Sequence, residues 1–231
     1  MKNADTYILG LLKQRTARDK QIKVGASNLS TPCGRCLAHD LAGVRRNTSN
    51  KWWLGAVIGT ATHGLVEDRA VKDKNNLSEY RVVLGEIPGY GKVKSTLDLY
   101  RIRERNLVDL KTTTRDKLGP LRRAHAEEPD EFDTDSVRSA RFKLTAYWNQ
   151  VMLYGKAMVE AGYPVDTVSI VFVCRDGKTD TDIWGIDAEF DPERADAVWS
   201  RALTIWEWLQ SGGDPRLVEE HPDCWACDNE F

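Results

Sequence analysis

The sequence predicts an α/β fold in which helices cover a central β-sheet, and three kinds of pattern predict it. Residues 91–112 alternate apolar and polar side chains in two runs separated by a charged turn, which is the period of half-buried strands. Residues 166–175 are almost continuously apolar, as in a strand covered on both faces, and residues 182–190 follow as a further strand. Residues 142–162 and 192–210 repeat apolar side chains at helical intervals, and a glycine lies at or just after the C-terminal end of each segment. Such strands and helices build a sheet packed against helices.

Length and composition are those of a soluble globular protein. At 231 residues the chain can bury a sizeable core. It has no apolar run of membrane-spanning length, and its first residues lack the apolar core and cleavage site of a secretory signal. We therefore expect a cytoplasmic protein, or one of the host cytoplasm if the source is viral, with no membrane partner. The net charge of −2 argues against a strong nonspecific nucleic-acid binder, so such contact must come from a local patch.

Four of the five cysteines form two CxxC pairs, one near each end of the chain. Cysteines of a cytosolic chain serve metal or redox chemistry more often than a disulfide framework. We therefore expect one shared metal site with the thiolate ligands Cys33, Cys36, Cys224 and Cys227. Pro32, preceded by Ser and Thr, places the first pair at the start of a helix, where backbone amides can donate to thiolate sulfurs.

This shared site also predicts the domain organisation. We expect a single domain over residues 1–231, with a core of about 52–210. A small cysteine subdomain would be formed by about 27–45 and 211–231. Because metal sites fold together with their ligands, the site should stabilise the joined ends of the chain.

A helix is expected at residues 52–69, where apolar side chains recur at roughly helical intervals. Gly59 and Gly64 weaken this helix but allow a neighbouring backbone to approach closely. His63 and Glu67 are four residues apart and therefore share a face. Taken alone, this pattern favours a helix packed on the sheet with a hydrogen-bonded histidine.

The alternating stretch at residues 91–112 predicts a hairpin with paired acidic side chains. If the hairpin turns at Arg103-Glu104, Asp98 and Asp109 stand opposite each other, about 5 Å apart at Cβ. Two like charges so placed destabilise a sheet unless something neutralises them, and Mg²⁺ or Mn²⁺ prefers such oxygen ligands. Lys111 points to the same face, two residues after Asp109. The alternative is a solvated strand face with a surface salt bridge.

Three further segments complete the predicted core. Residues 80–87 read as a strand before the hairpin. Residues 115–141 are polar and charged, and we expect them to form a long mobile loop beside the site, either a lid or strand guide or a disordered linker. On the helix at 142–162, Gln150 and Tyr154 share a face, an arrangement that serves packing more often than chemistry.

Taken in order, these motifs resemble the PD-(D/E)xK nuclease core, and especially the RecB-like exonucleases that include CRISPR-associated and phage-encoded iron–sulfur members. The resemblance covers most of the chain, from about Cys33 to Cys227. Its elements are Cys33, GTATHGLVED around His63, Asp98, Asp109-x-Lys111, Gln150-x-x-x-Tyr154 and the C-terminal cysteines. The resemblance implies a restriction-endonuclease-like core, with a mixed central sheet flanked by helices and a four-cysteine cluster joining the terminal segments.

By this resemblance the chain is a divalent-metal-dependent deoxyribonuclease, an exonuclease that hydrolyses phosphodiester bonds of single-stranded DNA or at DNA ends. A histidine ligand makes manganese more plausible than strict magnesium dependence. The resemblance implies that the metal is bound by His63, Asp98, Asp109 and the backbone carbonyl of Leu110. Lys111 would activate the attacking water, and Gln150 and Tyr154 would contact the substrate backbone. Glu67 would lie behind His63 and contact the metal site through a water molecule.

The cysteines depart from the family pattern, which commonly has one N-terminal and three C-terminal ligands, whereas this chain has two and two. A tetrahedral site of four thiolates suits either a 4Fe-4S cluster or zinc, and the resemblance favours iron–sulfur. Two other functions stay open. One is a non-catalytic nucleic-acid or partner-binding module with a structural zinc site. The other is a nuclease subunit that needs a helicase or recombination partner in DNA recombination or repair.

Overall fold

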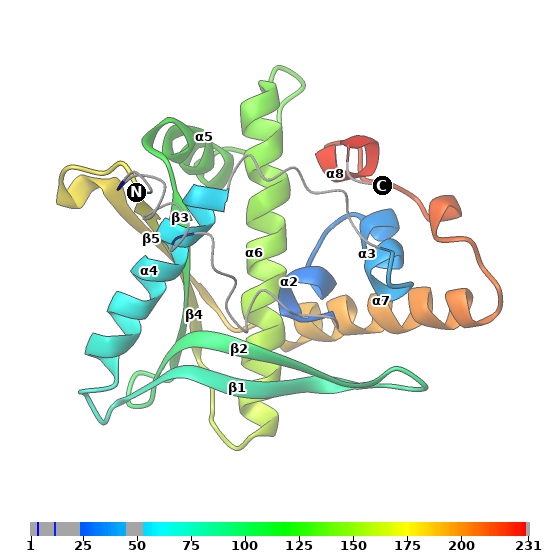
Figure 1. Cartoon of the computed structure of the whole chain (residues 1–231), viewed down its shortest axis with the longest axis horizontal. Coiled ribbons are helices and arrows are strands. Elements are labelled where there is room, and N and C mark those ends of the chain that lie inside the picture. The colour runs from blue at the N-terminus through cyan, green and yellow to red at the C-terminus, as the bar shows by residue number, and fades with distance from the viewer. Residues whose placement is uncertain (1–3, 5–11, 13–23, 45–52, 230–231) are drawn as a thin grey trace.

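A mixed five-stranded sheet forms the centre of this computed structural model, which describes residues 4, 12, 24–44 and 53–229 (Figure 1). The strands lie in sequence order across the sheet, and β3 and β4 are parallel while the other neighbours are antiparallel. The strands are β1 (Asn76–Ile87), β2 (Gly91–Arg101), β3 (Asn106–Thr113), β4 (Thr167–Cys174) and β5 (Ile183–Glu189). The predicted mixed sheet flanked by helices is confirmed.

Helices cover the sheet and connect its parallel strands. They are α2 (Ala26–Leu29), α3 (Gly34–Leu41), α4 (Trp53–Ala70), α5 (Arg115–Ala126), α6 (Asp135–Glu160), α7 (Pro192–Gln210) and α8 (Trp225–Asn229). Short 3-10 turns lie at Asp180–Asp182 and Pro215–Leu217. The pair α5 and α6 is the crossover that a parallel β3–β4 connection requires. Helix α6 packs on β1, β3 and β4, and α4 packs on β1, β2 and β3.

The side chains in the middle of the sheet are apolar, and the helices bury them. Strand β4 buries Val168, Ile170 and Phe172 almost completely, and β3 buries Leu107 and Leu110. Most of these side chains share one core cluster with apolar residues of α6 and α7. Burial of this apolar surface holds the two carboxylate-bearing strands β2 and β3 in a rigid frame.

The β1–β2 hairpin extends beyond the other strands toward α7, along the bottom of Figure 1. A register shift between Val83 and Gly85 bends β1, and Gly85 has a positive φ of 152°. The ring of Trp199 lies directly against Gly85, and Trp206 Nε1 donates to the carbonyl of Pro88 at 2.7 Å. These contacts fix the far end of the hairpin on α7.

Gly85→Ala should therefore lower the free energy of unfolding by roughly 2–4 kcal/mol. A Cβ at this position would stand 2.3 Å from Cζ2 of Trp199, and the backbone conformation disfavours an L side chain. Gly89→Ala is the matched control, since Gly89 also has a positive φ of 77° but a Cβ there meets nothing within 4 Å. Urea unfolding of both variants measures the difference. Equal losses of unfolding free energy in the two variants would show that a clash with Trp199 does not contribute.

Residues 115–126 and 135–141 are helical, with a turn at 127–134 between them, which corrects the expected long loop. Helix α5 buries Leu118, Leu121 and Ala124, and α6 begins within the same segment. The turn between the helices is held by Arg141, whose guanidinium pairs with the buried Asp133 at 2.7 Å and donates to three backbone carbonyls. Three apolar residues at helical spacing were hidden among many charges, so the pattern resembled a loop.

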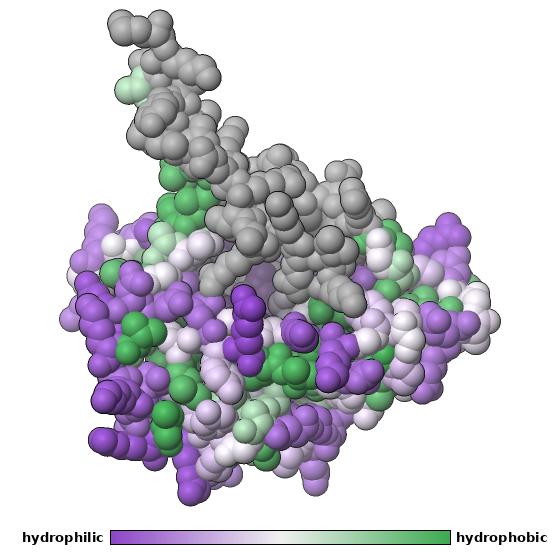
Figure 2. All heavy atoms as spheres, turned by 60° about the horizontal axis from the view of Figure 1, so that its bottom comes forward, coloured by the Kyte–Doolittle hydropathy of each residue, from purple (hydrophilic) through white to green (hydrophobic). Residues whose placement is uncertain are grey.

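No described helix combines the length and apolar character needed to cross a bilayer. Figure 2 turns the β1–β2 face toward the viewer and shows hydrophilic and hydrophobic side chains interspersed over it. The cleft that carries the candidate active site lies along this hairpin.

Candidate active site

A cleft of about 1070 Å³ is bordered by α4, the β1–β2 hairpin, part of β3 and one face of α6. Residues Val24 and Ser27 contribute a further wall. Every polar residue to which the sequence assigned a role, except Glu67 and the cysteines, lines this cleft: His63, Asp98, Asp109, Lys111, Gln150 and Tyr154, together with Leu110. The fold thus gathers residues from four elements at one place.

The β2–β3 hairpin has the register that the sequence predicted, and both Asp98 and Asp109 line the cleft. Strands β2 and β3 pair Leu99 with Val108 and Arg101 with Asn106, and the same register extended by one position sets the two aspartates opposite. The backbone ladder ends at Leu99, and Oδ2 of Asp98 instead accepts the Leu110 N–H at 2.7 Å. The carboxylate therefore takes the place of a backbone partner where the strands separate, and this fixes its orientation.

His63 approaches Asp98 from α4. Its Nδ1 lies 3.1 Å from Oδ1 of Asp98, and this hydrogen bond raises the pKa of His63 above its ordinary value. The approach depends on Gly59, because a Cβ there would stand 2.9 Å from Oγ1 of Thr112 on β3. The sequence predicts a close approach of a neighbouring backbone. At Gly59 a side chain approaches instead, and at Gly64 a Cβ would meet nothing within 4 Å.

Glu79 joins this group, and the sequence reasoning missed it. The register of β1 and β2 sets Glu79 opposite Asp98, between the pairs Ser78–Leu99 and Tyr80–Leu97. Donor atoms of His63, Glu79 and Asp98 all lie within 4.8 Å of one another. Glu79 has a positive φ of 49°, which is unusual for a non-glycine residue inside a strand and is typical of functional sites. The sequence offers no spacing signal for it, since β1 pairs with β2 across a long hairpin.

Asp109 begins a chain of contacts that crosses the cleft to α6. Lys111 Nζ lies 2.7 Å from Oδ2 of Asp109 and donates to Oε1 of Gln150 at 2.9 Å. Gln150 Nε2 then donates to the Tyr154 hydroxyl at 3.1 Å, and this hydroxyl donates to the carbonyl of Thr96 at 2.9 Å. Lys111 is therefore held from both sides.

Burial and charge set the ionisation of these groups. Burial raises the pKa of Asp109 to about 6, although the Lys111 ammonium opposes the rise. For Lys111, burial opposes the charge, but the Asp109 carboxylate outweighs it and the pKa of Lys111 lies above its ordinary value. Burial also raises the pKa of Tyr154 to about 12. At neutral pH Lys111 is therefore a cation and Tyr154 a neutral hydrogen-bonding group.

The donor set fits a hard or borderline divalent cation. Oδ2 of Asp109 is buried, and it accepts a charge-assisted contact from the Lys111 ammonium 2.7 Å away. A buried carboxylate needs such compensation, and Lys111 supplies one positive charge to a cleft that holds several carboxylates. Oxygen donors together with one imidazole are ligands that Mn²⁺ and Mg²⁺ accept.

Glu67 lies one helical turn beyond His63 on α4, at partial exposure. It is not among the described residues that line the cleft. A position behind His63 therefore stays a prediction.

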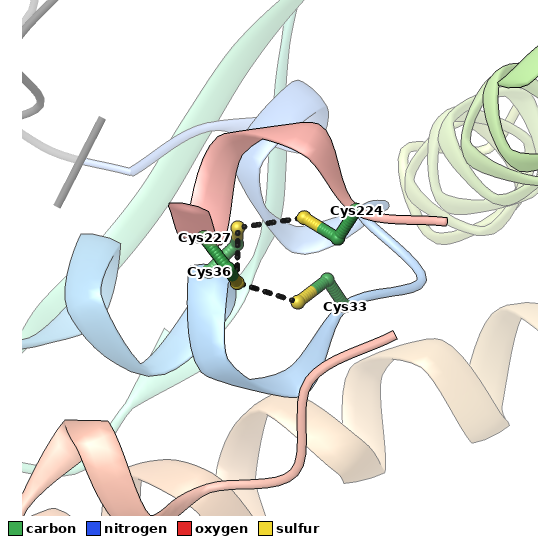
Figure 3. A group of neighbouring side chains, drawn as sticks. All are labelled: Cys33, Cys36, Cys224 and Cys227. Carbon is green, nitrogen blue, oxygen red and sulfur yellow. Dashed lines mark hydrogen bonds between the residues drawn. The ribbon is translucent and has the colours of Figure 1, made fainter. Parts of the chain in front are cut away.

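The four predicted cysteine ligands come from opposite ends of the described chain and lie together (Figure 3). Cys33 caps α3 and Cys36 lies in its first turn, as the sequence predicted, while Cys224 precedes α8 and Cys227 lies within it. The Sγ atoms of Cys33 and Cys227 are 3.3 Å apart, and the Sγ atom of Cys36 lies 3.3 Å from that of Cys224 and 3.5 Å from that of Cys227. This four-cysteine group links the N-terminal and C-terminal segments, which confirms that part of the predicted fold.

The surroundings of Cys33 favour its ionised form. The neighbouring Cys36 thiol lowers the pKa of Cys33 to about 4 by hydrogen bonding, and the backbone N–H of His221 donates to the Cys33 sulfur at 3.4 Å. Thiolates, not thiols, bind metals. Within the same group the pKa of Cys36 is raised by its hydrogen bond to Cys33 and the pKa of Cys227 is raised by burial, so a metal would have to displace protons from these thiols.

A mixed sheet with opposed aspartates, a lysine and a histidine in one cleft matches the restriction-endonuclease-like core that the sequence implied. Among solved structures, the chain is similar to a putative exonuclease from Eubacterium rectale, with TM-score 0.51 and 13% identity over 94% of this chain and 93% of that chain. It is also similar to LHK-Exo from Laribacter hongkongensis in complex with dAMP, with TM-score 0.50 and 12% identity over 82% of this chain and 89% of that chain. No family model and no curated protein sequence matches the chain. At these identities the likeness establishes a shared fold.

Proposed function

We propose that this protein is a divalent-metal-dependent DNA exonuclease that hydrolyses phosphodiester bonds of single-stranded DNA or at DNA ends. The observation that carries the proposal is the group of His63, Glu79 and Asp98, whose donor atoms lie within 4.8 Å of one another in the same cleft as Asp109 and Lys111. The fold shared with exonucleases, one of them bound to dAMP, supports the same conclusion.

The sequence predicted one ligand set of His63, Asp98, Asp109 and the backbone carbonyl of Leu110, and we infer that it divides into two sets that share Asp98. One set, which stays a prediction, comprises Asp98, Asp109 and the backbone carbonyl of Leu110. The other comprises Asp98, His63 and Glu79, whose donor atoms lie within 4.8 Å of one another. When bound, Mn²⁺ or Mg²⁺ would supply a nucleophile at neutral pH and charge compensation on the phosphate. Sharing one carboxylate between two sets suits a site with one or two ions.

Lys111 supplies a fixed positive charge beside the scissile phosphate. Its raised pKa keeps the ammonium protonated at neutral pH, so it orients the attacking water and stabilises phosphate charge better than it removes a proton. Gln150 and Tyr154 hold the ammonium in place through the hydrogen bonds to Lys111 and Thr96. Their contact with the substrate backbone stays a prediction.

A basic row along the hairpin favours a polynucleotide over a mononucleotide. Arg81, Lys92 and Lys94 are exposed and line the same cleft as the carboxylates. Lys94 and Lys92 lie on the same face of β2 as Asp98, at about 13 Å and about 20 Å along the strand from Asp98. A single nucleotide cannot span that distance, whereas the phosphates of an extended strand can.

The double variant Lys92→Ala/Lys94→Ala should weaken binding of single-stranded DNA and leave kcat nearly unchanged. Each lost phosphate contact on a single strand reduces the salt slope of log Kd by about 0.7, so the slope should fall by about 1.4. Fluorescence anisotropy at several salt concentrations measures the slope. Lys72→Ala/Lys74→Ala, two exposed lysines outside the cleft lining, is the control. An unchanged slope in the first variant would place the strand elsewhere.

The activity is tested on end-labelled single-stranded and double-stranded DNA with Mn²⁺, Mg²⁺ or chelator. We expect progressive shortening from an end that requires the metal. Binding without cleavage would favour the non-catalytic module, and cleavage seen only with an added ATPase would favour a partner-dependent subunit. Full activity in Asp98→Ala/Asp109→Ala would remove the nuclease assignment.

Two organisational expectations belong to the same proposal. The chain would act as one domain over residues 1–231, with a core of about 52–210. The cysteine subdomain would be formed by about 27–45 and 211–231. A cytoplasmic location, and a helicase or recombination partner, also stay predictions.

A further inference from the structure

The spacing of the four cysteine sulfurs does not fit the iron–sulfur cluster that the resemblance implied. All four Sγ atoms lie within 4.8 Å of one another, and three pairs are separated by 3.3, 3.3 and 3.5 Å. In a four-iron cluster each cysteine binds a different iron around a core of inorganic sulfide, so the cysteine sulfurs stand far apart. A single tetrahedral ion with Zn–S bonds of about 2.3 Å places its sulfurs about 3.8 Å apart. We propose that Cys33, Cys36, Cys224 and Cys227 bind one zinc ion.

Backbone contacts hold the C-terminal segment close against the turn that carries Cys33 and Cys36. Segment 218–221 lies across the CGRC turn, where Arg35 N–H donates to the carbonyl of Glu219 at 3.0 Å and Arg35 Nε donates to the carbonyl of Val218 at 3.1 Å. Gly34 is needed there, because a Cβ would stand 3.0 Å from the same Glu219 carbonyl. Figure 3 shows the four sulfurs gathered between the two helical turns.

Apolar packing closes the other side of the site. Cys33, Cys36 and Cys224 are buried, and Phe142 and Ala226 pack against them. Separating the sulfurs to fit four irons and four sulfides would open this apolar contact. A single ion requires only a small adjustment.

The zinc would brace one wall of the candidate active site. Residues 24–32 lead directly to Cys33, and their backbone is held by Arg201, which donates to the Pro32 carbonyl at 3.0 Å and to the Leu29 carbonyl at 3.3 Å. Asn149, next to Gln150 on α6, donates to the Ser30 carbonyl at 3.0 Å. The ion therefore joins the C-terminal segment to the wall of the cleft. The zinc assignment itself stands on the sulfur geometry and does not depend on the proposed nuclease function.

Metal analysis of the full chain tests the proposal. Protein purified without air from iron-supplemented cells should be colourless and contain one zinc per chain, with neither iron nor acid-labile sulfide. The variant His63→Ala/Asp98→Asn should keep that zinc, which separates this site from the cleft. Brown protein with about four irons and four sulfides per chain would overturn the proposal, and so would one iron without sulfide. This result is independent of whether DNA is cleaved.

Cysteine variants locate the ion. Cys224→Ser should reduce the zinc content to near zero, whereas Cys174→Ser should keep one zinc, because Cys174 is buried at the end of β4 and outside the group. Replacement of zinc by Co²⁺ in the wild-type protein should give the intense visible absorption of a tetrahedral thiolate site, a readout that stands even if Cys224→Ser folds poorly. Absence of that absorption, or zinc retained in Cys224→Ser, would contradict the assignment.

Discussion

Asp109→Asn is expected to lower the rate of Mn²⁺-dependent DNA cleavage by about 10³-fold or more. The change removes one ligand charge and at the same time removes the counter-charge of Lys111, which lies 2.7 Å from Oδ2. Because both effects concern the reacting phosphate, kcat should fall far more than binding of DNA. Single-turnover cleavage of labelled DNA measures the loss.

The control for this prediction is Asp68→Asn, an exposed aspartate on the same helix as His63 but outside the cleft lining. It should retain wild-type activity. Circular dichroism of Asp109→Asn should show an intact fold, so that lost activity cannot be ascribed to unfolding. Cleavage within tenfold of wild type in a folded Asp109→Asn protein would show that this carboxylate does not take part.

Lys111→Ala is expected to reduce cleavage by about 10²–10³-fold and to change how the protein responds to metal. Without the ammonium, the buried Asp109 carboxylate loses its ion-pair partner, and such loss is strongly destabilising. A bound cation would then be the remaining compensation for Asp109. Mn²⁺ should therefore raise the Tm of Lys111→Ala more than that of the wild type.

Thermal melting with and without Mn²⁺ measures this difference, and Lys143→Ala is the control. Lys143 lies on α6 beside a separate cavity of about 410 Å³, so its loss should change neither activity nor the metal effect on Tm. An equal effect of Mn²⁺ on the wild type and Lys111→Ala would mean that the cation does not bind at Asp109. Activity close to wild type in Lys111→Ala would remove the lysine from the reaction.

The parts of the site that lie on one hairpin could be predicted from the sequence. The positions of Asp98, Asp109 and Lys111 relative to one another follow from strand alternation and a tight turn, both of which act over a few residues. His63 and the pair Gln150 and Tyr154 were named through the family resemblance, because nothing local to their helices indicates which strand they face.

Glu79 shows where such reasoning fails. It reaches the site through a hairpin whose register depends on the bulge at Gly85 and on the packing of the hairpin tip on α7. Helix α5 shows a second limit. Leu118 and Leu121 are isolated among charged residues in the sequence, and they can be recognised as core residues only once the structure shows that they are buried.

By itself the sequence determined the class of fold, the opposed aspartates of the hairpin and the pairing of two CxxC motifs, because alternation, helical period and cysteine spacing are local. The tertiary structure decided which side chains surround Asp98, how Lys111 is held, and how closely the four sulfurs approach. Those distances depend on packing between elements far apart in the chain. They are also what distinguishes a single zinc ion from an iron–sulfur cluster at the cysteine site.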